Sequence, residues 1–142
     1  MRYFVYIVIV LSAFSACRRD NTDNALIKDN KIVAEQLFDA YNKHDWDSVA
    51  TFYTDTTTFI TTANFTPFRK SKATIVSEFT SAEQSTPDIH AEIKGIYNDR
   101  NKTIIEYSLI GNTATGPLLQ HNCLVWTLKN RKITQEIIYI LQ

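Results

Sequence analysis

With 142 residues, of which 44% are hydrophobic and 21% charged, the chain has the size and composition of one ordinary globular domain. Three glycines and three prolines are too few for a fibrous or disordered protein, and two cysteines are too few for a disulfide scaffold. Basic and acidic residues balance at 15 each, so the basic excess of a nucleic-acid-binding protein is missing and we expect no nucleic-acid partner.

The first 16 residues have the pattern of a secretory signal. Arg2 supplies a positive charge, residues 3–14 are almost entirely apolar, and two small residues precede Cys17. The apolar run is shorter than the roughly 20 residues of a membrane-spanning helix. Its end, Phe14-Ser15-Ala16-Cys17, resembles a bacterial lipobox, the signal in which the cysteine is lipidated and becomes the first mature residue.

This resemblance implies an exported protein of the bacterial cell envelope that is anchored to a membrane through Cys17. An uncleaved anchor and a plain signal peptide are the alternatives. Residues 17–28 are polar and lack periodicity, so we expect a flexible tether there and the folded domain at residues 29–142.

Two helices are expected at the start of the domain. Apolar residues recur at helical spacing along residues 29–44, and Asp29 or Asn30 is suited to cap this helix. A shorter helix follows, with Asp45 at its N-cap and Asp47 in its first turn.

A strand, a loop and a third helix come next. Residues 56–62 are rich in β-branched side chains and predict a strand. Residues 64–70 read as a loop that holds two phenylalanines and a proline. Ser71 then has the position of an N-cap, with a helix at residues 72–82.

The rest of the chain has the period-two pattern of strands. Alternation begins after Pro87, residues 98–101 are a strong turn signal, and strands are predicted at residues 102–110, 118–128 and 133–141. Sequential strands joined by short turns are antiparallel. Helices gathered ahead of such a meander indicate an α+β domain.

The order of these elements resembles the SnoaL-like branch of the nuclear-transport-factor-2-like superfamily. Four segments carry the resemblance: residues 42–46 (NKHDW) with 52–55 (FYTD), residues 71–75, the glycine-flanked break at residues 111–116 (GNTATG), and residues 130–133 followed by Tyr139. It implies a cone-shaped, curved antiparallel sheet packed on about three N-terminal helices. It also implies an apolar pocket at the wide end and a homodimer through the sheet.

Enzymes of this kind remove a proton next to a carbonyl group, which requires a base in an apolar pocket and a donor for the developing oxyanion. Enzymatic relatives often carry a histidine in the glycine-flanked break and an aspartate at the end of the last strand. This chain has Ala114 and Leu141 there. We therefore expect no conventional catalysis.

Two other residues are candidates for a relocated base. Asp55 has a suitable position after the second helix, although aspartate before two threonines is also a common turn residue. His121 shares a strand face with Cys123 and is either at the pocket or at the surface. Glu106 and Glu136 are read as exposed, or as buried only in a dimer interface.

A set of aromatic residues is the best candidate for a ligand-binding lining, because tyrosine and tryptophan add hydrogen-bonding groups to apolar walls. The same residues also suit a plain core. The set is Tyr41, Trp46, Phe59, Phe79, Tyr107, Trp126 and Tyr139.

Three functions follow from these observations. The leading hypothesis is a lipid-anchored domain that binds a small apolar molecule without conventional catalysis. The alternatives are a cyclase-, isomerase- or hydratase-type enzyme with a relocated base, and a protein-interaction module with a filled cone. No nucleotide-binding loop or metal-ligand spacing occurs in the sequence, so we expect neither a cofactor nor a metal.

Overall fold

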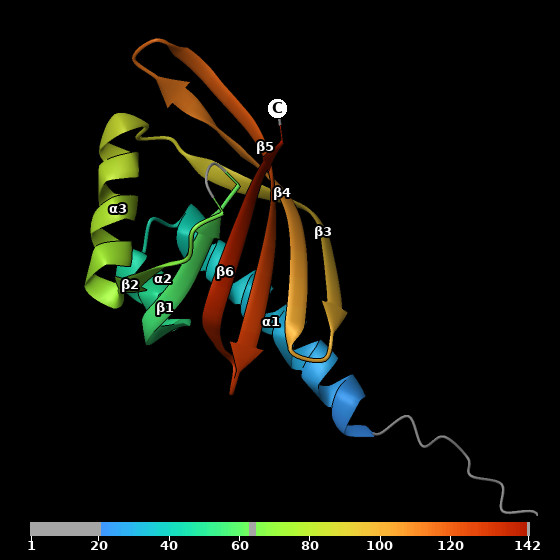
Figure 1. Cartoon of the computed structure of the whole chain (residues 1–142). Helices are drawn as coiled ribbons and strands as arrows, with labels where there is room; N and C mark the ends of the chain where they lie inside the picture. Colours follow the sequence, from blue (N-terminus) through green and yellow to red (C-terminus); the bar gives the residue numbers. More distant parts are fainter. Residues whose placement is uncertain (1–20, 63–64, 142) are drawn as a thin grey trace, which may run out of the picture.

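The structure is a computed structural model that describes residues 21–62 and 65–141. The predicted signal and Cys17 lie outside these residues. Within them, three helices pack on one face of a curved six-stranded sheet (Figure 1). The expected α+β architecture, with the helices mostly ahead of an antiparallel meander, is therefore confirmed.

Helix α1 spans Asn21–Asn42 and is longer than the sequence pattern predicted. Residues 21–28, expected to be part of a tether, are its first turns. Helix propagation adds a hydrogen bond for each residue fixed, so a polar segment with good helix formers extends a helix that is already anchored. Asn30 is inside α1, not at its cap, and its amide donates to the carbonyl oxygen of Arg100 at 2.6 Å.

The chain reverses sharply between α1 and α2 (Trp46–Thr51). His44 has a φ of 55°, and the amides of His44 and Asp45 donate back to the carbonyls of Tyr41 and Ala40. This is the hydrogen-bond pattern of a Schellman motif. Asp45 then caps α2, as predicted, by accepting from the amide of Ser48 at 3.0 Å.

Strand β1 (Tyr53–Thr61) is followed by a short strand, β2 (Phe68–Ser71), which pairs antiparallel with it. The sequence reading of residues 64–70 as a loop missed β2, because a four-residue edge strand is too short to show alternation. Ser71 caps α3 (Lys72–Ser85) by accepting from the amide of Thr74, as expected.

Four long strands complete the sheet: β3 (His90–Asp99), β4 (Lys102–Thr113), β5 (Gly116–Lys129) and β6 (Lys132–Leu141). The sheet order is β2-β1-β6-β5-β4-β3. The predicted meander β3 to β6 is antiparallel throughout, whereas β1 runs parallel to β6. The expected break at residues 112–117 is only a tight hairpin turn between β4 and β5.

The core lies between the inner face of the sheet and α1 and α2. Its most deeply buried side chains are Val33, Val49, Ile105, Trp126 and Ile133, each at most 1% exposed. The five come from five different elements, α1, α2, β4, β5 and β6, so the helices and sheet share one contiguous core.

Candidate functional site

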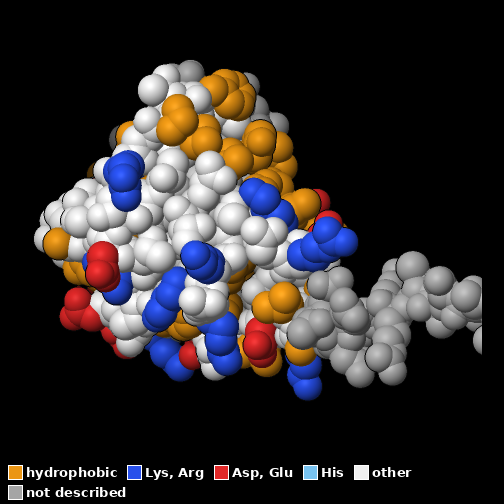
Figure 2. Space-filling model, turned by 60° about the horizontal axis from the view of Figure 1, so that its bottom comes forward, with side chains coloured by type: hydrophobic (Ala, Val, Ile, Leu, Met, Phe, Trp, Pro, Cys, Tyr) orange, Lys and Arg blue, Asp and Glu red, His pale blue; other side chains and the backbone are white. Residues whose placement is uncertain are grey.

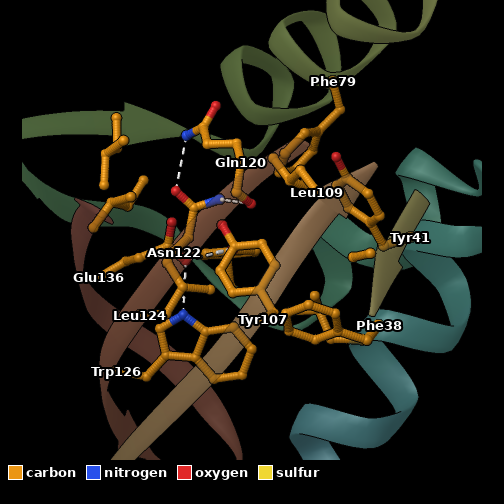
Figure 3. A pocket seen from close by; sticks show the side chains of 15 residues that line it. Phe38, Tyr41, Phe79, Tyr107, Leu109, Gln120, Asn122, Leu124, Trp126 and Glu136 are labelled. Carbon is orange, nitrogen blue, oxygen red and sulfur yellow. Dashed lines mark hydrogen bonds between the residues drawn. The ribbon is translucent and has the colours of Figure 1, made fainter. Parts of the chain in front are cut away.

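A cavity of about 260 Å³ opens between α1, α3 and the inner face of strands β3 to β6 (Figure 3). Most of its wall is apolar. The principal apolar and aromatic side chains that line it are Leu37, Phe38, Tyr41, Phe79, Leu109 and Leu124. Its volume is just below the roughly 300 Å³ at the lower end of pockets for drug-sized ligands, so it suits only a smaller organic molecule.

The cavity has a deep end and an open end. Trp126 at the deep end is fully buried, whereas Ile140 at the other end is 52% exposed. Ile140 is at the end of β6 that lies far from the β5–β6 turn. At the end of the sheet that holds the β5–β6 turn, the side-chain amide of Asn30 in α1 donates to the carbonyl oxygen of Arg100. The backbone amide of Leu128 donates to the carbonyl oxygen of Asn101 at the same end. The mouth is therefore at the opposite end of the domain from the start of α1.

Large apolar side chains surround this end of the molecule. Leu119, Ile140 and Leu141 are each more than half exposed, and strand pairing places Leu141 opposite His121, two residues from Leu119. Figure 2 shows apolar side chains gathered at the upper end of the molecule, while most lysine and arginine side chains on this face lie lower.

The carboxyl group of Glu136 lies in the cavity wall and is the most unusual group there. Glu136 is 5% exposed. Its Oε2 accepts two hydrogen bonds, from the hydroxyl of Tyr53 at 2.7 Å and from Nε1 of Trp126 at 2.8 Å. Figure 3 shows Glu136 beside Asn122, Leu124 and Trp126. The sheet thus presents a carboxyl group to a largely apolar space.

Burial raises the pKa of Glu136 above its ordinary value of 4.5, because the charged form loses its hydration. The hydrogen bonds from Tyr53 and Trp126 act in the opposite direction and are outweighed. Burial also raises the pKa of Tyr41 to about 12 and the pKa of Tyr107 further, so both phenols stay neutral at physiological pH.

Two amide side chains add polarity nearer the mouth. The amide of Gln120 donates to Oδ1 of Asn122 at 2.8 Å, and both residues line the cavity. Asn122 is 2% exposed. Glu136, Asn122 and Gln120 come from adjacent strands, so the polar groups form a strip along one wall.

The structure gathers four of the seven predicted lining residues: Tyr41, Phe79, Tyr107 and Trp126. The other three lie elsewhere. Trp46 stacks on His44 and Phe79 and donates to Glu83, Phe59 stacks between Tyr53 and Phe68, and Tyr139 is on the outer face of the sheet.

Neither candidate base lies at the cavity. The Asp55 side chain is 97% exposed and forms an ion pair with Lys72 at 3.0 Å. His121 is exposed on the outer face of β5, where Nδ1 lies 2.9 Å from the hydroxyl of Ser108. Along β5, His121 alternates with Asn122 and Leu124, which face inward. The alternative that placed His121 at the surface is therefore the correct one.

The expectation that Glu136 is exposed is wrong, and a β-bulge is the reason. Strict alternation from Ile133 places Glu136 on the opposite face from that buried residue. The register between β5 and β6 shifts next to Leu128, and Glu136 pairs with Trp126 instead. Both Ile133 and Glu136 are consequently buried. Nothing in the sequence marks this extra residue.

Among the residues that the structure describes, no group of three or more histidine, cysteine or acidic side chains is placed to hold a metal. Cys123 is a free cysteine on the outer face of β5. Within the described part of the chain, no helix is long and apolar enough to cross a membrane.

Comparison with known proteins gives a family and a set of structural neighbours. The family model for the SnoaL-like domain matches residues 34–136, well over half of the chain. A search of curated proteins finds no match. Solved structures with the same fold include eight that are 10–18% identical to this chain, which is evidence of fold alone.

Three neighbours illustrate the range. A putative SnoaL-like polyketide cyclase from Jannaschia sp. CCS1 has a TM-score of 0.70 at 10% identity, over 81% of this chain and 87% of that one. An LEH-like epoxide hydrolase from M. tuberculosis has a TM-score of 0.68 at 15% identity, over 81% of this chain and 84% of that one. A hypothetical protein with a ketosteroid-isomerase-like fold from Catenulispora acidiphila, in complex with trimethylamine, has a TM-score of 0.66 at 14% identity, over 75% of this chain and 83% of that one.

Proposed function

Since this chain belongs to the SnoaL-like domain family, and since its cone encloses an open cavity, we propose that the domain binds a small, predominantly apolar molecule there. The main support for this proposal is the lining of the cavity, whose walls are apolar and aromatic apart from one strip of polar groups that includes Glu136. Such walls supply affinity through burial, and a few polar groups orient the ligand.

Filling the cavity tests this proposal. Ala91 lines the cavity and is 4% exposed, so Ala91→Leu extends a side chain into the ligand space. We expect ethylbenzene, followed by protein NMR shifts, to bind the parent and to bind Ala91→Leu at least about tenfold more weakly. Ala73→Leu, on the exposed side of α3, is the control and should bind like the parent. Equal binding to all three proteins would contradict the proposal.

A second candidate function is proton transfer, with Glu136 as the relocated base. It is favoured by one observation: burial raises the pKa of this carboxyl in an apolar cavity, the condition under which a carboxylate becomes an effective base at neutral pH. We expect a weak, Glu136-dependent exchange of the α-protons of acetophenone for deuterium if this function operates. Exchange at the same rate with Glu136→Gln would exclude it.

Anchoring through Cys17 is a further part of the proposed function, supported by the lipobox-like residues 14–17. Because the mouth lies at the opposite end of the domain from the start of α1, an anchored domain would present its cavity away from the bilayer. Labelled palmitate should be incorporated into the parent expressed in a bacterium and not into Cys17→Ser. Incorporation into both proteins would contradict the lipidation.

The outer face of the sheet supports a homodimer as the state of the domain. Ile104, Val125 and Ile137 are neighbours across three strands on this face, and Tyr139 and Leu141 continue the apolar surface along β6. Contiguous exposed apolar surface of this kind is typical of a protein–protein interface. A partner of different sequence would use the same face.

A further inference from the structure

Glu136 uses its two carboxyl oxygens differently. Oε2 accepts both hydrogen bonds, from Tyr53 and Trp126, and the two donors hold the carboxyl plane in one orientation. No buried side-chain oxygen among the described residues lacks a partner, and no hydrogen bond to Oε1 is found within that part of the chain. Oε1 is therefore the oxygen that remains accessible in the cavity wall.

The two hydrogen-bond donors on the carboxyl suit its charged form, whereas burial opposes that form. Tyr53 and Trp126 both donate, and a carboxylate that accepts such bonds is stabilised. A carboxylic acid would instead require an acceptor for the hydrogen on its second oxygen, and none is hydrogen-bonded there among residues 21–62 and 65–141. The site supplies donors to one oxygen and leaves the other to a donor from outside the protein.

No cation forms an ion pair with Glu136 among residues 21–62 and 65–141. The nearby Lys70 attracts its charge, but Lys70 is itself paired with Glu78, whose carboxylate acts in the opposite direction. A buried carboxylate without a counter-ion is costly, and an opposite charge beside it offsets that cost. A positively charged ligand would supply the missing partner.

The walls of the cavity match such a ligand. Phe38 and Tyr107 meet edge to face at 5.2 Å, and Tyr41 and Phe79 do so at 5.5 Å, so aromatic rings in several orientations line the space. Aromatic faces attract organic cations, and more strongly where water is displaced. These rings also cover the apolar substituents of the ligand.

We propose that the ligand is a protonated amine with an apolar body, whose ammonium group donates to Oε1 of Glu136 while its body fills the aromatic cavity. This inference rests on the proposed binding function and names the ligand class for the same site. Four observations support it together: the two donors on Oε2, the accessible Oε1, the absence of an ion pair to Glu136 among the described residues, and the aromatic walls.

Binding is then linked to protons. The raised pKa of Glu136 means that the empty cavity holds a proton on this carboxyl to a higher pH than usual, so an ammonium ligand that binds while the carboxyl is protonated displaces that proton to solvent. The other ionisable groups facing Glu136 are Tyr53 and Tyr107, whose pKa values are raised, and the paired Lys70 and Glu78. Neither phenol ionises near neutral pH, so Glu136 is the group that releases the proton.

Three probes of one shape test the ligand class. They are 1-phenylethylamine, which is protonated at neutral pH, acetophenone, which only accepts hydrogen bonds, and ethylbenzene, which does neither. We expect calorimetry to show that the amine binds at least about tenfold more tightly than ethylbenzene. In a series of pH values, its binding heat should vary with the ionisation heat of the buffer wherever the empty-site carboxyl is still protonated, because a proton is then released, whereas the heats for the neutral probes should not.

Glu136→Gln is the decisive variant, because its amide keeps an oxygen for Tyr53 and Trp126 and presents a donor in place of Oε1. It should bind the amine about tenfold or more weakly than the parent and ethylbenzene within about twofold. Glu106→Gln removes the same charge from the outer face of β4, which is separated from β6 by β5, and should leave all three affinities unchanged.

Tighter binding of acetophenone than of the amine, or unchanged amine binding by Glu136→Gln, would overturn the amine proposal and leave the binding function standing. Ethylbenzene is the separate check on that function. If no probe binds, the proposed function fails together with this inference.

Discussion

Glu136 combines burial, two neutral donors and no described counter-ion, so its protonation is linked to folding. The folded pKa is raised above the ordinary value of 4.5, and the folded state therefore holds its proton more tightly than the unfolded chain. The corresponding stability is fully present below the unfolded pKa. It is lost as the pH rises through the folded pKa.

We expect the free energy of unfolding of the parent to fall as the pH rises above 4.5, and this slope to flatten in Glu136→Gln, which cannot ionise. Urea denaturation at a series of pH values measures both. Glu106→Gln is the matched control and should keep the slope of the parent. An equal slope in the parent and Glu136→Gln would assign the pH dependence to another group.

A substitution of Tyr53, which donates one of the hydrogen bonds to Glu136, tests these bonds by removing a donor instead of the acceptor. Tyr53→Phe removes one of the two donors to Oε2 within the core. We expect the free energy of unfolding near neutral pH to decrease by about 1 kcal/mol and the pKa of Glu136 to rise further. The NMR shift of the Trp126 indole N–H, which bonds the same oxygen, reports that pKa. A lowered pKa would contradict the arrangement.

Among elements, the junction of α1, α2, α3 and β3 is held by one network. Glu83 of α3 accepts from Nε1 of Trp46 at 2.7 Å and lies 3.0 Å from Nδ1 of His44, whose Nε2 lies 2.7 Å from the carbonyl oxygen of Ile89. The Trp46 bond, followed by His44, lowers the pKa of Glu83. The α1–α2 turn, α2, α3 and the residue before β3 are thus connected through one carboxylate.

Trp46→Phe should lower the urea midpoint, because it removes the indole donor while keeping an aromatic ring against Phe79. A lowered folded pKa gives stability that is present above the unfolded pKa of Glu83 and is lost as the pH falls through the folded one. This acid-side loss should therefore be smaller in the variant. Tyr97→Phe, whose exposed hydroxyl is 3.4 Å from Glu106, should change the midpoint little.

At the scale of the whole molecule, the two faces of the sheet have separate roles in the proposed function. Ile138 lines the cavity, and the next residue, Tyr139, lies on the outer face at 36% exposure. A change at Tyr139 can therefore alter association without touching the ligand site.

We expect sedimentation velocity to show a dimer of the parent and a monomer of Tyr139→Lys, because a charge buried in an apolar interface without a partner is costly. Ethylbenzene binding should be the same in both proteins, since the cavity is on the other face. Thr134→Lys, on the same strand near the β5–β6 turn, is the control for added charge and should remain dimeric. A dimeric Tyr139→Lys would place the interface elsewhere.

Much of the fold followed from the sequence because its signals are local. Helix periodicity, the capping residues Asp45 and Ser71, and period-two strands joined by short turns all act between near neighbours in the chain. The order of those elements was enough to indicate the α+β cone. The start of α1 and the short β2 were missed, because propagation of a helix and pairing of an edge strand depend on what the segment packs against.

The binding site, like the fold, was only partly predictable from the sequence. The sequence by itself made Tyr41, Phe79, Tyr107 and Trp126 candidates for the lining, and it has Ala114 and Leu141 at the positions where the resemblance implies a histidine and an aspartate. Only the tertiary structure decided which aromatic residues face the cavity, and that Glu136 joins them. One bulge in β6 inverts the face of every residue beyond it, and its position depends on pairing with β5 rather than on any residue of its own.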